Sequence, residues 1–325
     1  MSGATDPQAN VNGTSPPGRV ESITFPSSTK DKLAGTLYYP TDYSPSSRLP
    51  AIVLGHGLGA IQSMGLQCYS HIFAARGYIC LTFDYRHFGL SEGQPRQLLD
   101  TERQNADWHS ALRYVRKLDS VDAERVGIFG SSFGGGHVIR VAAEDDKVAA
   151  TIAQCPFTSG LRSALQLSFS SLPVTVARGV ADMLFGWGNN TVMIPLAAKP
   201  GHSALMNSPD AEPEYLKLVP QKDMDRLFHN QVAARFALKI LLQYPGAKAK
   251  HVKNPILFAV CGKDSVAPAG PTLKYAKQAK KGVIKHFEDM GHFSIYVGED
   301  FKKVTKIYLD FLDEALPVKG AAAHL

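Results

Sequence analysis

Short runs of apolar residues recur along the chain, separated by segments with helical spacing. After two edge-like runs at 20–25 and 33–39, consecutive apolar residues occupy Ala51–Leu54, Tyr78–Phe83, Val126–Phe129, Val148–Ala153 and Ile256–Val260. Strands buried on both faces are apolar at successive positions rather than at alternate ones. The pattern therefore predicts a mostly parallel sheet that opens with an antiparallel pair of strands joined by a turn at Lys30–Lys32.

The segments between these runs have the spacing of amphipathic helices. Within Thr101–Leu118, apolar residues such as Trp108 and Leu112 recur at intervals that place them on one helical face. Phe133–Ala143 follows a strand run directly, and an apolar stripe across 301–312 predicts the last helix. Strands that alternate with helices are typical of an α/β fold whose sheet is covered on both faces.

One long stretch breaks this alternation. From residue 156 to about residue 250 there is no clear strand pattern, but there are helical patches and several prolines. A plain connection of this length is uncommon inside a compact domain. We therefore predict a helical cap at 156–250, inserted into a core formed by 19–155 and 251–317. Residues 1–18 are expected to be a disordered tail, and residues 318–325 a flexible one.

Composition narrows the class of protein. With 325 residues, 44% of them hydrophobic and 20% charged, the chain can build a substantial core. The formal net charge is +6, but no nucleic-acid-binding motif accompanies it, so we expect no nucleic-acid partner. No apolar run approaches the roughly 20 residues that a membrane-spanning helix needs.

The cysteines also limit the possibilities. None of the four is spaced as C-x-x-C, which argues against a zinc ribbon or a thioredoxin-type site. Most lie in apolar strand-like runs, so we expect buried, reduced thiols and an intracellular compartment.

The segment Gly130–Gly134 carries the strongest chemical signal. Its sequence, G-S-S-F-G, has the form G-x-S-x-G, and it lies directly between a strand run and a helical pattern. A nucleophile elbow requires this strand–turn–helix setting, and the helix N-terminus can then stabilise an oxyanion. We therefore take Ser132 as the candidate nucleophile. The alternative is a Ser/Gly turn without chemical meaning.

A second motif, H-G-L-G at 56–59, follows the strand run that begins at Ala51. Enzymes with a nucleophile elbow take one oxyanion-hole amide from the loop after this strand and the other from the residue after the nucleophile. The backbone N–H groups of Leu58 and Phe133 are therefore the candidate oxyanion hole. His56 is expected to orient the loop without contacting the substrate.

Two residues late in the chain complete a candidate triad. Asp264 follows the strand run that ends at Val260, and His292 follows a short strand at 283–287. An aspartate can fix the tautomer of a histidine, which then acts as general base for the serine. The chain order Ser132, Asp264, His292 is that of the hydrolases whose serine lies on such an elbow.

Other assignments of the acid and the base remain open. Asp264 could be a turn residue, and Glu288 and Asp289 are alternative acids, although both are close in sequence to His292. Other histidines are weaker candidates for the base: His109 and His137 fall on predicted helices, and His324 lies in the tail.

From Val20 to Leu316 the chain resembles the α/β-hydrolase fold superfamily. Besides the triad motifs, Asp84–Ser91 resembles the D-x-R-x-x-G-x-S loop found after the fourth strand in that superfamily. Within it, the chain is similar to the fungal branch related to dienelactone hydrolases and X-prolyl dipeptidyl-peptidase-like esterases, which includes polyketide transferases and toxin-cluster hydrolases. Dienelactone hydrolases use a cysteine nucleophile, so Ser132 departs from them and their substrate is not carried over.

The resemblance implies an eight-stranded, mostly parallel sheet and acyl transfer to water or to another hydroxyl, without a metal or an organic cofactor. We therefore expect a serine hydrolase for an ester or thioester of a small acyl or polyketide-like molecule in secondary (toxin) metabolism. A carrier-bound or CoA thioester is a further candidate substrate. The alternatives are an acyltransferase with an alcohol acceptor and a non-catalytic binding protein.

The last three residues, Ala323-His324-Leu325, resemble the S-K-L peroxisomal signal. They predict a peroxisomal location. The alternative is an ordinary frayed end on a cytoplasmic protein.

Overall fold

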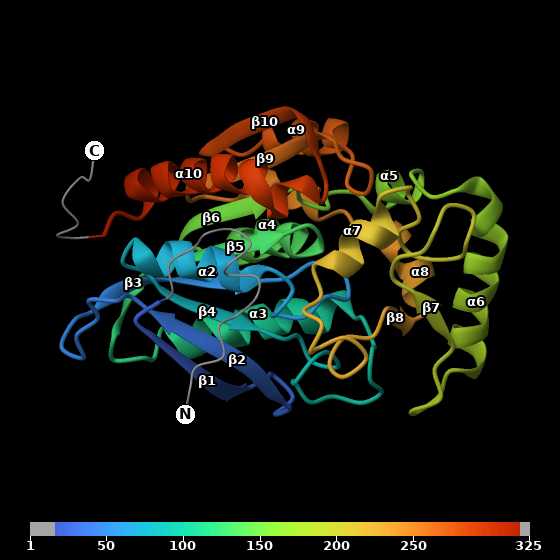
Figure 1. Ribbon diagram of the computed structural model, residues 1–325, viewed down its shortest axis with the longest axis horizontal. Helices are drawn as coiled ribbons and strands as arrows, with labels where there is room; N and C mark the ends of the chain where they lie inside the picture. The colour runs from blue at the N-terminus through green and yellow to red at the C-terminus, as the bar shows by residue number, and fades with distance from the viewer. Residues whose placement is uncertain (1–16, 319–325) are drawn as a thin grey trace.

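The computed structural model describes residues 17–318, and its centre is an eight-stranded sheet in the order β1-β2-β4-β3-β5-β6-β9-β10 (Figure 1). The strands are β1 (Arg19–Pro26), β2 (Lys32–Tyr39), β3 (Leu49–Gly55), β4 (Ile79–Phe83), β5 (Val121–Ser131), β6 (Val148–Gln154), β9 (Ile256–Lys263) and β10 (Gly282–Gly291). β2 pairs antiparallel with both β1 and β4, and all other neighbours are parallel. The predicted mostly parallel sheet is confirmed.

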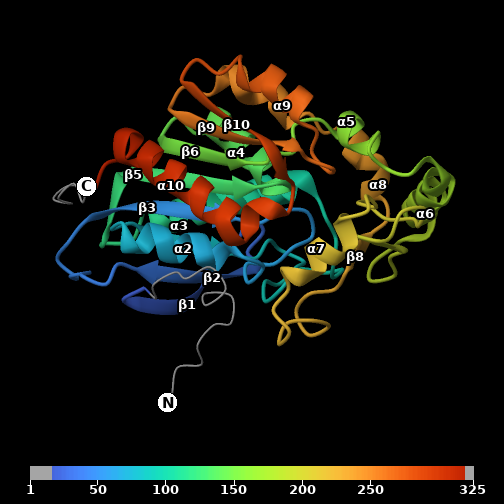
Figure 2. The same ribbon diagram turned by 45° about the horizontal axis from the view of Figure 1, so that its top comes forward.

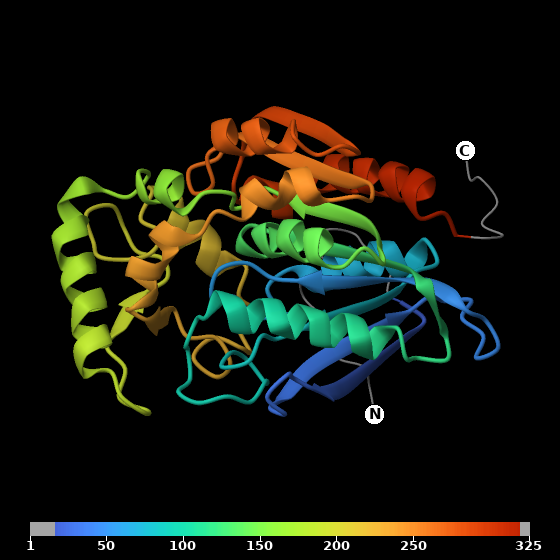
Figure 3. The same ribbon diagram turned by 180° about the vertical axis from the view of Figure 1, so that it is seen from behind.

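Helices cover both faces of this sheet (Figures 2 and 3). One face carries α2 (Leu66–Ala75) and α10 (Gly298–Ala315), and the other carries α3 (Thr101–Val115), α4 (Phe133–Glu144) and α9 (Ala269–Ala276). Each layer has its own apolar core, because a strand that is apolar at successive positions presents side chains to both sides. The sheet is therefore held rigidly from both faces, which fixes the positions of the loops at its strand ends.

α2 and the short α9 are the core helices that the sequence pattern did not predict. Most residues of α2 are buried, including polar ones such as Gln67 and Ser70. A helix that is covered on nearly all sides lacks the polar stripe from which helical periodicity is recognised. α3, which keeps exposed polar residues such as Glu102 and Arg103, occupies nearly the predicted range 101–118. α4 is largely buried as well, and it occupies nearly the range 133–143 that was predicted from its place directly after a strand run.

The residues between β6 and β9 form a cap at the carboxyl ends of the strands, beside the sheet (Figures 1 and 3). Its α-helices are α5 (Gly160–Ala164), α6 (Leu172–Phe185), α7 (Ala211–Lys217) and α8 (Phe236–Lys239), and its strands are β7 (Met193–Pro195) and β8 (Gln231–Ala233). Three 3₁₀ helices, labelled η, complete it: η1 (Phe169–Ser171), η2 (Ile240–Leu242) and η3 (Pro245–His251). β7 and β8 pair antiparallel, so the expectation of a stretch without strands is wrong in this detail. Strands of three residues are too short to show an alternating pattern.

Several further predictions concern single residues and the chain ends. All four cysteines are buried and free, as predicted. Within residues 17–318, no helix combines the length and the apolar character needed to cross a bilayer. Residues 1–16 and 319–325 lie outside the described part, and with them most of the two predicted tails and the tripeptide that begins at Ala323.

Candidate active site

Ser132 lies on the turn between β5 and α4. Its backbone angles, φ 57° and ψ −117°, are rare for a residue with a side chain, and strain of this kind marks functional turns. Gly130 and Gly134 allow the turn to be this tight. An added Cβ at Gly130 would overlap the backbone of Gly134, and one at Gly134 would lie 2.5 Å from the His56 carbonyl oxygen. The serine is thus presented on a sharp strand-to-helix turn, as the sequence predicted.

His292 joins Ser132 to Asp264 through hydrogen bonds. Its Nε2 lies 2.9 Å from Ser132 Oγ, and its Nδ1 lies 2.7 Å from Asp264 Oδ2. The other carboxylate oxygen of Asp264 accepts the backbone N–H groups of Val266 and Ala267, at 2.9 and 2.6 Å. The structure therefore brings the three residues of the candidate triad together, with Asp264 and His292 on the loops after β9 and β10.

The electrostatics of the pair favour a charged histidine. Burial lowers the pKa of His292, but the neighbouring Asp264 carboxylate and Cys155 together raise it, and the pKa lies well above 6.5. The protonated imidazole is therefore stabilised by Asp264. The neutral imidazole, which can take a proton from Ser132, becomes abundant only as the pH rises through this higher value.

The two candidate oxyanion-hole amides flank the serine. Phe133 is the first residue of α4, so its N–H lies outside the hydrogen bonds of the helix. Leu58 follows Gly57, whose added Cβ would lie 3.1 Å from Ser132 Cβ. Within the described residues, neither N–H donates a backbone hydrogen bond in the turns and loops. Neither amide is therefore committed to such a backbone partner, as an oxyanion-hole donor requires, and their role stays a prediction.

His56 belongs to the same loop and is buried. Its Nδ1 lies 3.1 Å from the Gly57 carbonyl oxygen, and its ring packs edge-on against Tyr85. Burial lowers the pKa of His56 to about 4, which keeps the ring neutral. These contacts agree with the expectation that His56 orients the loop.

The alternative acids lie elsewhere. Asp289 has an exposed side chain and forms an ion pair with Lys263 at 2.8 Å. Glu288 is also exposed, next to it on β10. The geometry thus favours Asp264 as the partner of His292.

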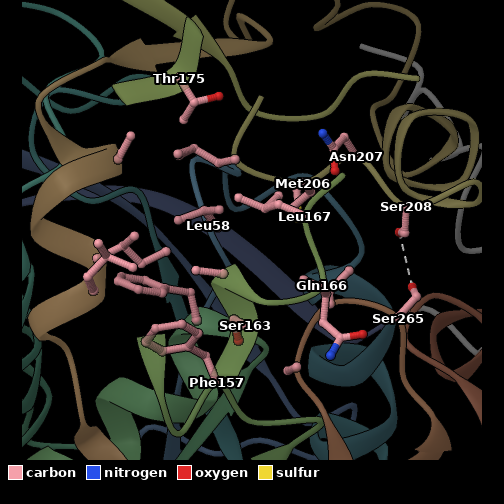
Figure 4. Close-up of a pocket in the computed structure, with 18 of the residues that line it drawn as sticks. Leu58, Phe157, Ser163, Gln166, Leu167, Thr175, Met206, Asn207, Ser208 and Ser265 are labelled. Carbon is pink, nitrogen blue, oxygen red and sulfur yellow. Dashed lines mark hydrogen bonds between the residues drawn. The ribbon is translucent and has the colours of Figure 1, made fainter. Parts of the chain in front are cut away.

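A cavity opens beside Ser132, between the core and the cap (Figure 4). Its volume, including the mouth, is about 880 Å³. Most of its lining is apolar and comes from Leu58 and Phe133 in the core and from Phe157, Leu167, Leu172, Val176, Leu205, Met206, Leu238, Ile240 and Leu241 in the cap. A few polar groups interrupt this lining, among them Ser208 and Ser265, which are hydrogen-bonded to each other at 3.2 Å. Such a lining suits an apolar acyl chain.

A second, smaller cavity of about 440 Å³ also reaches Ser132. It is lined by His292 and by residues such as Met64, Tyr215 and Tyr296. Ser132 and Leu58 line both cavities. A carbonyl carbon at Ser132 could therefore have its two substituents in different cavities.

The cap contributes a contact that no sequence motif predicts. Tyr215, on α7, donates its hydroxyl to the Leu58 carbonyl oxygen at 2.7 Å. No motif marks Tyr215, which lies 157 positions from Leu58 in the sequence. The contact depends on how the cap folds back over the core.

One group of side chains near the triad has the geometry to hold a metal ion. Among the described residues, donor atoms of Cys155, Asp264 and His292 lie within 4.8 Å of one another. An ion there would have to replace the hydrogen bond between Asp264 and His292. The same residues can therefore serve a metal or the triad, but not both at once.

The chain matches a known family over more than half its length. Residues 2–193 match the family model described as PET hydrolase-like. The quorum-quenching protein AidA of Acinetobacter baumannii is 47% identical over 289 residues, which cover 89% of this chain and 93% of AidA.

More distant relatives carry enzyme names. The thiohydrolase aneE of Aspergillus aculeatus is 26% identical over 89% of this chain and 92% of its own length. The polyketide transferase ATR5 of Stachybotrys chlorohalonatus is 25% identical over 84% of this chain and 92% of its own length. These two relatives agree with the resemblance to the fungal branch.

Among solved structures, DcsB in complex with its substrate analogue superposes with a TM-score of 0.75 at 20% identity. The superposition covers 92% of this chain and 99% of DcsB. At this identity it bears on the fold, and it extends the similarity to the cap and the second half of the core, beyond residue 193.

Proposed function

The chain belongs to the PET hydrolase-like family of α/β hydrolases, and on this basis we propose that it is a serine hydrolase acting through an acyl-enzyme. The observation that carries the proposal is the hydrogen-bonded chain Ser132–His292–Asp264 at the wall of an apolar cavity. The substrate is an ester or a thioester whose acyl part is largely apolar.

In the first half-reaction, His292 Nε2 takes the proton of Ser132 as Oγ attacks the carbonyl carbon. The carbonyl oxygen becomes an oxyanion, which the N–H groups of Leu58 and Phe133 stabilise. The protonated His292, held by Asp264, then gives its proton to the departing alcohol or thiol. The acyl group remains as an ester on Ser132.

In the second half-reaction, water takes the place of the leaving group. His292 accepts a proton from water as the hydroxide adds to the acyl carbon, and the oxyanion forms again beside the same two amides. Collapse of this intermediate breaks the bond to Ser132 Oγ, which recovers its proton from His292. The products are a carboxylic acid and free enzyme.

The two cavities that meet at Ser132 support separate binding places for the two ends of the substrate. The larger one is the more apolar and takes the acyl chain, and the smaller one takes the leaving group. The names of the relatives support acyl or polyketide-like esters and thioesters, including compounds of secondary metabolism. Since AidA is named a quorum-quenching protein, small acylated signalling molecules, including lactones, belong in the substrate panel.

A transferase is the second candidate. A relative named as a polyketide transferase and the separate cavity for a leaving group both favour it. The same acyl-enzyme would react with a hydroxyl of an acceptor bound in the smaller cavity. Only the second half-reaction differs between the two candidates.

A substrate panel with product analysis tests the proposal. The wild-type protein and Ser132→Ala are compared on acyl esters, thioesters and lactones of increasing chain length, with and without a competing alcohol. We expect hydrolysis by the wild type and a loss of roughly 10⁶ in turnover for Ser132→Ala. Formation of the ester of the competing alcohol in preference to the carboxylic acid would favour the transferase. Equal activity in both proteins would refute both candidates.

A further inference from the structure

The helix α6 of the cap carries its apolar residues on the side away from the protein. The residues at 175, 179 and 182, which face inward, are Thr, Gly and Asp, and all three are buried. Surface helices ordinarily place their apolar stripe toward the core. In α6 this order is reversed.

The outward side forms one continuous apolar surface, which we call the α6 surface. Residues spaced three or four apart on a helix lie on one face, and such a stripe runs through the helix and just past its end. The α6 surface consists of Val176, Val180, Met183, Leu184, Phe185 and Trp187, which are 43–76% exposed. Figures 1 and 3 show α6 at the outer edge of the cap, on the side away from the main sheet. Contiguous exposed apolar patches mark sites of protein or membrane association.

The segment that carries this surface contains more basic than acidic residues. Between Phe157 and Ser208 the sequence contains Arg162, Arg178 and Lys199 but only one acidic residue, Asp182. The Asp182 carboxylate is buried and is paired with Arg235 at 2.6 Å. The segment that carries the α6 surface therefore presents cations without an exposed acid.

We propose that the α6 surface binds an anionic lipid bilayer, with the helix lying in the interface. A helix with Phe, Leu and Trp on its outer face and flanking Arg or Lys is the pattern of interfacial binding to anionic lipid. A second copy of the chain is the alternative occupant, and the test below separates it from a bilayer.

The α6 surface adjoins the larger cavity, and this suggests how a bound bilayer would supply substrate. Val176 belongs to the α6 surface and also lines the larger cavity, as does Leu172 at the start of the helix. An apolar acyl substrate dissolved in the bilayer would then reach Ser132 without crossing water. This supply of substrate rests on the proposed function. Lipid binding itself is measured without substrate, so the two proposals can fail separately.

Vesicle co-sedimentation tests the binding. The full chain is mixed with vesicles of phosphatidylcholine, or of phosphatidylcholine and phosphatidylglycerol in equal parts, at low and high ionic strength. We expect binding to the anionic vesicles that weakens as salt screens the charges. The chain has two tryptophans, and Trp108 is buried, so a blue shift in emission reports Trp187. We expect the blue shift in the wild type and not in Trp187→Phe.

Two double variants provide a matched comparison. Leu184→Ser/Phe185→Ser removes apolar area from the α6 surface, and we expect about a tenfold weaker partition into anionic vesicles. The control, Val20→Ser/Leu90→Ser, changes two residues of comparable exposure (53% and 62%) outside the cap and should bind as the wild type does. Circular dichroism melting checks that both variants fold.

Three results would overturn the proposal. The first is failure of the wild type to bind anionic vesicles at low ionic strength. The second is equal binding by the wild type and the Leu184→Ser/Phe185→Ser variant. The third is a stable dimer without lipid that this variant alone converts to a monomer, which would assign the α6 surface to a second copy of the chain.

Discussion

Tyr215 donates its hydroxyl to the carbonyl oxygen of Leu58 at 2.7 Å, and so ties the cap to the loop of the candidate oxyanion hole. The Leu58 carbonyl and the N–H proposed to bind the oxyanion belong to the same loop. Tyr215 is buried, and its hydroxyl lies in a part of the site that water reaches poorly. We infer that Tyr215 is a positioning residue for the Leu58 amide.

Tyr215→Phe should therefore lower kcat by about tenfold, less than the 10²–10³ that follows removal of an oxyanion donor itself. KM should change little, since the ground-state contacts of the acyl chain remain. Affinity for a transition-state analogue should fall in step with kcat. Tyr78→Phe is the matched control, because Tyr78 donates a buried hydrogen bond to the Leu316 carbonyl far from the site. A loss of kcat in the control as large as in Tyr215→Phe would mean that both variants act through stability alone.

The pH dependence should follow His292. Asp264 and Cys155 together raise the pKa of His292 well above 6.5, and the neutral imidazole is the form that accepts a proton. kcat/KM for a neutral ester should therefore rise with pH along an acid limb whose midpoint lies above 6.5. In Asp264→Asn the raising effect of the carboxylate is removed, so this midpoint should move downward. A pH profile that is the same in both proteins would show that Asp264 does not act on His292.

Substitution of Asp264 should lower kcat far more than substitution of Asp289. Asp264→Asn keeps the size of the side chain but can present the wrong partner to the imidazole, and the equivalent change in a protease triad costs about 10⁴ in kcat. Asp289→Asn removes only an exposed ion pair with Lys263, and activity should stay close to that of the wild type. Steady-state kinetics on one ester ranks the variants. The opposite ranking would move the acid to β10.

The larger cavity should set the acyl chain length. Leu167 projects into it (Figure 4), so Leu167→Trp should fill part of its volume. We expect the ratio of kcat/KM for dodecanoyl over butanoyl esters to fall by about tenfold, the effect of losing one or two buried methylene groups. Leu165→Trp, two residues away and 64% exposed, is the control and should leave the ratio unchanged. An unchanged ratio in Leu167→Trp would place the acyl chain elsewhere.

Local pattern was enough to predict the sheet, α3, α4 and the candidate triad. Ser132 lies in a motif whose flanking strand and helix can both be recognised from the pattern of apolar residues. Asp264 and His292 each follow a strand that can be recognised in the same way. The sequence did not reveal α2, whose polar residues are buried, the short helix α9, or β7 and β8, which are too short. Tyr215 was missed for a different reason: its role depends on a contact between cap and core that no local pattern encodes.

The proposed mechanism requires an acyl-enzyme on Ser132, and trapping this intermediate tests the mechanism. The protein is mixed with an excess of a slowly hydrolysed p-nitrophenyl ester and quenched in acid, and the modified peptide is identified by mass spectrometry. We expect a burst of one p-nitrophenol per chain, an acyl group on Ser132, and neither burst nor acyl group in Ser132→Ala. An acyl group on another residue, or a burst that persists in Ser132→Ala, would contradict the mechanism.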